Sequence, residues 1–178
     1  MCDATSSNEA ILTAIRHTVP TLLPNRPEVS DIQPVSQSRH HSVWKVGTRD
    51  GTLLAVKHQP FAPFTKNRPY DLLEVEQHTC KLLGASQAPI PHLVGINRDH
   101  DLIFSQWCGD LTLDDVCQTS NAQTIAQVGK YTINGFLAFE AAFRQHTPDL
   151  AHRAFPGCDP ESLLKTWGEI IGPISDRL

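Results

Sequence analysis

Apolar residues follow a helical spacing near the N-terminus and a strand-like spacing after it. Within residues 8–18 they recur at helical intervals, which predicts a short helix ending at Pro20 and the two prolines behind it. From residue 31 they occur in short extended runs, and the Asp50-Gly51 pair between two of these runs is typical of a hairpin turn. Residues 31–58 are therefore expected to form three antiparallel strands.

A second helix is expected over residues 71–83, where the apolar stripe returns and Gly84 stands at the position of a C-cap. Residues 93–96 and 102–104 then have the character of two strands joined by a polar turn. Three further helices are expected over residues 111–117, 124–144 and 160–171.

This order of elements determines the expected fold class. Three strands, one helix, two strands and then helices predict an α+β protein with an antiparallel sheet of about five strands. We expect three regions along the chain: an N-terminal helical segment over residues 1–30, a sheet-containing lobe over residues 31–109, and a helical region over residues 110–178.

Composition narrows the possible partners. The 178 residues include 15 Lys and Arg against 19 Asp and Glu, a formal net charge of −4. Proteins that bind nucleic-acid phosphates usually carry a basic excess, so nucleic acid is not an expected partner. No apolar run approaches the roughly 20 residues that span a membrane, and the N-terminus has no apolar signal segment. The five cysteines are odd in number and form no Cys-x-x-Cys pair, which indicates reduced thiols and a cytoplasmic protein.

The candidate chemistry lies at the end of the third expected strand. Strand alternation places Ala55 and Lys57 on one face, so that a small side chain leaves room for a flat ring beside a fixed cation. The helix that follows contains Glu74 and Glu76. A carboxylate on that helix could hold the lysine toward a polyphosphate. Taken alone, Lys57 would be a solvated strand-end lysine, and Glu74 is expected to be a plain surface charge.

Three stretches give this region a family resemblance. Residues 31–118, about half the chain, resemble the N-terminal lobe of the aminoglycoside phosphotransferase and choline-kinase-like branch of the protein-kinase fold. The matching stretches occur in the family's order: Leu54-Ala55-Val56-Lys57, then Glu76 to Gly84 followed by Pro89-Ile90-Pro91, then residues 102–109 followed by Leu111 and Leu113.

The resemblance implies an ATP site. Lys57 would contact the α- and β-phosphates of ATP, Glu76 would pair with Lys57, and Ala55 would touch the adenine face. Residues 36–42, a segment that ends with Ser42, would cover the phosphates. Mg²⁺ would neutralise the negative charge of the phosphates.

Backbone groups of the hinge, the segment between the last expected strand and Gly109, complete this expected site. They would bind the adenine edge, and the candidates are Gln106, Trp107 and Cys108 with the preceding Ser105.

Two departures from the family pattern limit these expectations. The segment over residues 36–42 contains no glycine, although close approach to phosphate usually requires one. The family's His-Gly-Asp catalytic loop and its metal-binding Asp are also not found in the sequence. Cys108-Gly109-Asp110-Leu111 resembles that loop but stands where the hinge belongs, with Asp115 in place of the loop's Asn. We therefore assign no catalytic residue and no metal ligand.

Two functions remain open. One is the ATP-binding portion of a phosphotransferase that transfers the γ-phosphate to a hydroxyl of a small polar molecule. The other is a catalytically inactive nucleotide-binding or protein-interaction module. The expected helix over residues 124–144 is rich in apolar residues, and an uncovered face on it would favour self-association.

Overall fold

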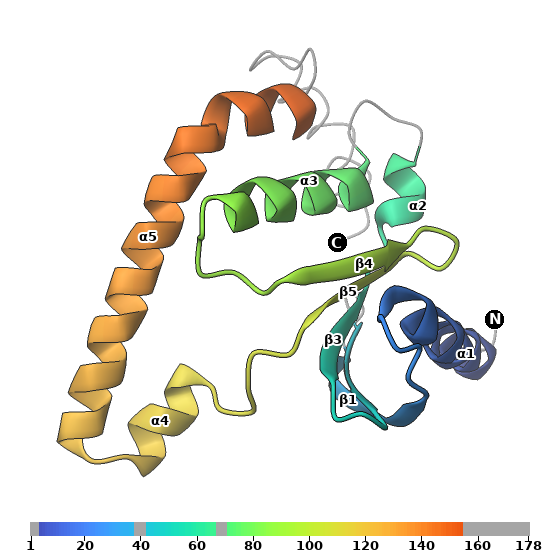
Figure 1. Ribbon diagram of the computed structural model, residues 1–178, viewed down its shortest axis with the longest axis horizontal. Helices are drawn as coiled ribbons and strands as arrows, with labels where there is room; N and C mark the ends of the chain where they lie inside the picture. The colour runs from blue at the N-terminus through green and yellow to red at the C-terminus, as the bar shows by residue number, and fades with distance from the viewer. Residues whose placement is uncertain (1–3, 38–41, 67–70, 155–178) are drawn as a thin grey trace, which may run out of the picture.

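The computed structural model describes residues 4–37, 42–66 and 71–154, which form an α+β fold (Figure 1). The expected helix over residues 160–171 lies outside the described residues, as do residues 38–41 of the expected phosphate-covering segment. The elements are α1 (Ala4–Leu22), β1 (Val29–Gln37), β2 (Ser42–Thr48), β3 (Leu53–His58), α2 (Ala62–Thr65), α3 (Leu72–Ala85), β4 (Leu93–Asn97), β5 (Leu102–Gln106), α4 (Leu113–Thr119) and α5 (Ala122–Ala154).

All five strands form one antiparallel sheet in the order β1-β2-β3-β5-β4. The predicted hairpin between β2 and β3 is confirmed, with Gly51 at a φ of +86°. The Asp50 carboxylate accepts hydrogen bonds from the Thr48 hydroxyl at 2.6 Å and the Thr52 N–H at 3.1 Å. These bonds, led by that from Thr48, lower the pKa of Asp50 and close the turn. The expected fold class, with its five-stranded sheet and packed helix, is therefore confirmed and consistent with a protein-kinase-like N-terminal lobe.

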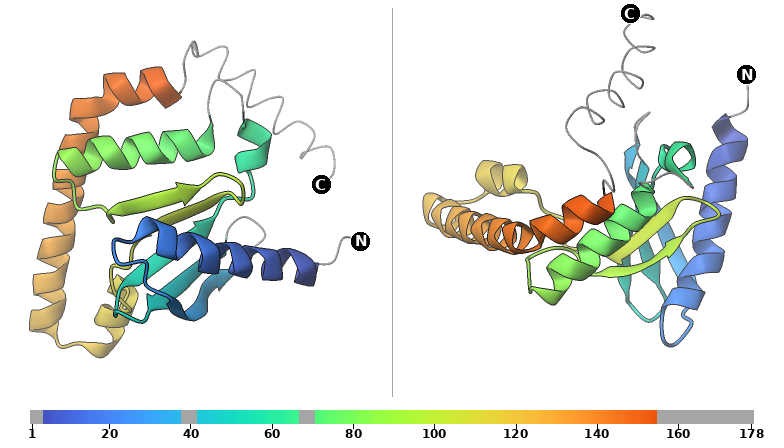
Figure 2. Two further views of the ribbon diagram at one scale, coloured as in Figure 1. Left: turned by 45° about the vertical axis from the view of Figure 1, so that its right-hand side comes forward. Right: turned by 90° about the horizontal axis from the view of Figure 1, so that it is seen from above.

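The two faces of the sheet are covered differently, because α1 and α3 lie on opposite sides of it (Figure 2). α1 buries Ile15 and Val19 on one face, against a core that includes Val56 and Phe104. On the opposite face a smaller core joins α2 and α3 to the sheet through Ala62, Leu73 and Ile103. Successive strand residues point to alternate faces, so Ile103 and Phe104 belong to different cores.

Two predicted helix ends were wrong. α1 continues through Pro20 to Leu22, because burial of its apolar side against the sheet extends beyond the proline. Gly84 is not the C-cap of α3, since the helix continues to Ala85 and Ser86 is the cap. The left-handed position after the helix is taken by Gln87, at a φ of +56°.

The helices after the sheet extend to one side of the molecule (Figure 1). α4 begins with a capping box in which Thr112 and Asp115 bond each other's backbone N–H. α5 is longer than the expected 124–144 and packs along α3, where the Ser86 hydroxyl lies 2.6 Å from His146 Nε2. Within the described part of the chain, no helix has the length and apolar character needed to cross a membrane.

Candidate functional site

Lys57 of β3 and Glu76 of α3 form an ion pair across the face of the sheet that α3 covers. The Lys57 Nζ lies 3.4 Å from Glu76 Oε2, and the two side chains are 38% and 29% exposed. Gln59 Nε2 donates to the same carboxylate oxygen at 3.2 Å. The pairing expected from the sequence is therefore present, and the Lys57 side chain remains partly exposed.

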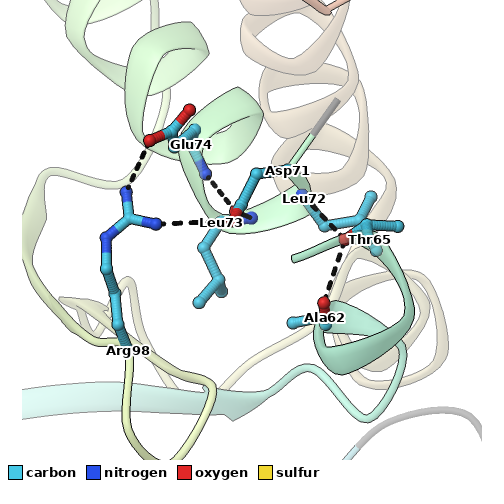
Figure 3. A network of polar contacts seen from close by, with 7 residues as sticks. All are labelled: Ala62, Thr65, Asp71, Leu72, Leu73, Glu74 and Arg98. Atoms are coloured by element: carbon cyan, nitrogen blue, oxygen red, sulfur yellow. Dashed lines mark hydrogen bonds and ion pairs between the residues drawn. The ribbon is translucent and has the colours of Figure 1, made fainter. Parts of the chain in front are cut away.

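The start of α3 is fixed by a network of polar contacts (Figure 3). Asp71 is the N-cap, and its Oδ1 accepts from the N–H of Leu73 at 2.9 Å and of Glu74 at 3.1 Å. The Thr65 hydroxyl joins α2 to this cap, because it donates to the Ala62 carbonyl at 3.0 Å and accepts from the Leu72 N–H at 3.2 Å. Holding the first turn of α3 fixes the rotation of the helix, and with it the direction of Glu76.

Arg98 explains why Glu74 does not compete for Lys57. Its guanidinium, in the turn between β4 and β5, lies 3.6 Å from Asp71 Oδ2 and 3.5 Å from Glu74 Oε1 (Figure 3). Glu74 is 68% exposed, in keeping with the expected surface position. Residues two apart on a helix point in different directions, so only Glu76 faces the sheet here.

The face of Lys57 contains the small side chain of Ala55, as strand alternation predicts. In the register of the sheet, Ala55 lies opposite Lys45 of β2 and Ser105 of β5, whereas Lys57 lies opposite Val43 and Ile103. Directly opposed residues share a face, so two lysines border Ala55 on the same surface. This surface combines the small side chains of Ala55 and Ser105 with two lysines.

Ser42 lies on the other face of the sheet. It is paired with His58, one residue beyond Lys57, so its side chain and that of Lys57 point to opposite sides. Within the sheet, Ser42 and Lys57 therefore do not share a surface. Burial lowers the pKa of His58, and the nearby carboxylate of Asp101 partly offsets that effect.

The hinge segment, which begins with the last residue of β5, uses two of its backbone N–H groups internally. Gln106 donates to the His92 carbonyl at 2.8 Å, and Trp107 donates to the Leu53 carbonyl at 3.2 Å. Cys108 follows in an exposed position, and among the described residues no backbone bond engages its N–H. Gly109 has a φ of +130°, which turns the chain away from the sheet. Of the three expected adenine contacts, Cys108 is therefore the position with an N–H available.

Lys45, Trp107 and Asp110 form a cluster that sequence reasoning missed. The Lys45 ammonium pairs with the Asp110 carboxylate and lies 5.2 Å from the centre of the Trp107 ring. The Trp107 indole N–H donates to Asp110 Oδ1 at 3.1 Å. These contacts, led by the hydrogen bond from Lys45, lower the pKa of Asp110. They tie the hinge to β2 beside Ala55.

The described residues contain no group of three or more His, Cys, Asp or Glu that could hold a metal ion. A pocket of about 550 Å³ lies between α3 and β4 and is lined in part by Cys80, Lys81 and His92. Burial raises the pKa of the Cys80 thiol, and the charge of Glu76 adds to this effect. The thiol is therefore uncharged at neutral pH.

Comparisons with known proteins identify a likeness to solved structures but none to a described family. No protein-family model and no curated protein sequence matches the chain. Among solved structures, the chain is similar to a Thermobifida fusca YX-ER1 protein provisionally assigned as a fructosamine-3-kinase, with 22% sequence identity and a TM-score of 0.42. The match covers 56% of this chain and spans 32% of that protein.

Proposed function

We propose that this chain binds ATP on the face of the sheet that contains Ala55 and Lys57, as the nucleotide-binding portion of a phosphotransferase. The observation that supports this most directly is the ion pair between Lys57 Nζ and Glu76 Oε2 at 3.4 Å. It joins a strand lysine to a helix glutamate in the way that kinases position a phosphate-binding ammonium.

The chemistry of each group suits a nucleotide. An ammonium has three N–H donors, so Lys57 can keep one on Glu76 and direct the others to phosphate oxygens. Ala55 gives an adenine ring room to lie against β3, and the N–H of Cys108 can donate to the edge of the ring. A polyphosphate would be attracted to Lys57, whereas the charge of Lys45 is already paired with Asp110 at the hinge.

Mg²⁺ has no ligand set among the described residues, so it would enter the site on the phosphates of the nucleotide. When bound there, it supplies neutralisation of the phosphate charge. Transfer of the γ-phosphate to a hydroxyl of a small polar molecule is the reaction that we propose. The acceptor would be bound by residues outside the surface described above.

Titration calorimetry with ATP and Mg-ATP tests the nucleotide site. We expect Lys57→Ala to weaken ATP binding more than tenfold, about 1.4 kcal/mol, and Glu76→Gln to weaken it less, because the ammonium stays but loses its anchor. Lys81→Ala removes the same charge from an exposed position of α3 and is the matched control. If the folded wild type binds no ATP, or if Lys57→Ala and Lys81→Ala have equal effects, the proposed site is wrong.

A second assay separates the phosphotransferase from a catalytically inactive module. Incubation with γ-labelled ATP and a panel of small polyols and amino sugars would detect transfer to a hydroxyl. Transfer that disappears in Lys57→Ala would support the phosphotransferase. ATP binding without transfer would limit the activity of this chain to nucleotide binding, and neither activity would favour the protein-interaction module.

A further inference from the structure

α5 presents a stripe of three exposed apolar side chains, Ile133, Phe136 and Leu137, which we name the α5 stripe. Their exposed fractions are 62%, 65% and 54%. Single apolar residues are common on protein surfaces, but neighbouring large ones on one helix face usually mark a contact surface. The three residues occupy adjoining positions of the helix, at i, i+3 and i+4.

The α5 stripe points away from the rest of the described structure. The packed side of α5 contains Gly135, whose neighbour is Pro89, together with buried Ala142 and with His146 beside Ser86. At about 100° of rotation per residue, the stripe lies roughly 150° around the helix from that side. Figure 1 shows α5 along one edge of the molecule, with its N-terminal half extending beyond α3 toward α4. Nothing in the described part of the chain therefore covers the stripe.

Two opposite charges flank the α5 stripe. Lys130 lies on its N-terminal side, and Glu140 lies on its C-terminal side, where Arg144 Nη2 contacts it at 2.6 Å. Lys130 and Glu140 are separated by about 80° of rotation around the helix axis. If a second α5 ran antiparallel to the first with Lys130 opposite Glu140, the same register would place Ile133 opposite Leu137. Each contact would then occur twice, as a two-fold symmetric interface requires.

We propose that a second copy of this chain docks on the α5 stripe in that antiparallel register. The apolar residues would form the centre of the interface, with one Lys130–Glu140 pair at each end. The two Phe136 rings would lie beside the two-fold axis. Antiparallel helices with apolar residues at this spacing pack side by side in helical bundles. This docking requires no nucleotide, so it does not depend on the proposed ATP site.

Analytical ultracentrifugation of the 178-residue chain tests the proposal. We expect a monomer–dimer equilibrium in the wild type, weakened more than tenfold by Phe136→Glu, because a carboxylate would then be buried among apolar groups. Tyr131→Glu is the matched control, since Tyr131 is 68% exposed on the same helix but lies off the stripe. A wild type that stays monomeric, or equal effects of the two variants, would overturn the proposal.

Charge reversal tests the register itself. Lys130→Glu and Glu140→Lys should each weaken the dimer, because each creates two like-charge contacts, and the double variant should restore it. Failure of the double variant to restore dimerisation would rule out this register.

Carbodiimide cross-linking of the wild type gives a measurement that needs no variant. Lys130 and Glu140 lie about 15 Å apart along one helix, too far for a zero-length cross-link within one chain. A Lys130–Glu140 cross-link found in the dimer band by mass spectrometry would support the proposal, and its absence from cross-linked dimers would contradict it.

Discussion

The side chain of Leu22, at the end of α1, lies against the backbone of Gly95 in β4. A Cβ placed on Gly95 would be 2.6 Å from Leu22 Cδ2 and 3.0 Å from Leu22 Cδ1. Gly95 also lies where the pairing of β4 with β5 shifts register. The missing side chain therefore lets α1 close over this edge of the sheet.

Gly95→Ala should destabilise the fold through this contact. The added methyl group forces Leu22 to move, and overpacking of this kind costs about 1–3 kcal/mol. Urea denaturation would measure the loss. In a Leu22→Ala background the methyl group has room, so the additional cost of Gly95→Ala should largely disappear. An equal cost in both backgrounds would place the effect in the strand backbone instead of the contact with α1.

Asp71 should stabilise the start of α3 mainly as a helix cap. Asp71→Ala removes the acceptor for two backbone N–H groups and should lower the free energy of unfolding by about 1 kcal/mol. Asp71→Asn keeps a capping oxygen and loses only the ion pair with the partly exposed Arg98, so its cost should be smaller. Denaturation of both variants, with Arg98→Ala for comparison, measures the two contributions. If Asp71→Asn proves as damaging as Asp71→Ala, the ion pair with Arg98 stabilises the protein more than the cap does.

The elements that could be predicted from the sequence are those with a strong local signal. The Asp50-Gly51 pair specifies the β2–β3 turn, and the alternation along β3 places Ala55 and Lys57 on one face. The pairing of Lys57 with Glu76 followed from a known arrangement of strand and helix, since no local pattern connects residues 19 apart.

The features that could not be predicted depend on tertiary contacts. Pro20 and Gly84 usually end helices, but packing against the sheet extends α1 past the first, and α3 continues past the second. The face of Ser42 depends on strand register, which one residue of shift reverses. The pair of Lys45 and Asp110 joins residues 65 apart, and nothing in their local sequences indicates it.

Burial of Ile15 should make α1 a necessary part of the folded lobe. The side chain is fully buried between α1 and the sheet, and Ile15→Ala would leave a cavity there that costs about 2–5 kcal/mol. Thr13→Ala changes an exposed residue of the same helix and is the control. Thermal unfolding followed by circular dichroism measures both. Equal, small effects would mean that the sheet retains its stability without the contact to α1.

His58 should make the protein less stable in mild acid. Burial lowers its pKa below the ordinary 6.5, so at pH values just below 6.5 the unfolded chain binds a proton that the folded protein does not. The free energy of unfolding should therefore fall as pH drops from about 6.5 toward the lowered pKa of the folded state, and be free of this penalty above 6.5. The neighbouring Asp101 affects stability at lower pH than His58 does. Burial raises the pKa of Asp101 from 3.8, so the contribution of Asp101 to stability declines as pH rises from 3.8 through the raised pKa of the folded state.

The measurement is urea denaturation of the wild type and of His58→Gln at pH values on both sides of the ordinary histidine pKa of about 6.5. The variant has no charge to gain at this position, so its stability should fall less between the two pH values. His17→Gln, the same substitution at an exposed histidine of α1, controls for the change of side-chain type. Identical pH dependence in the wild type and His58→Gln would contradict the assignment, because a histidine that loses hydration on folding must bind its proton more weakly in the native state than in the unfolded chain.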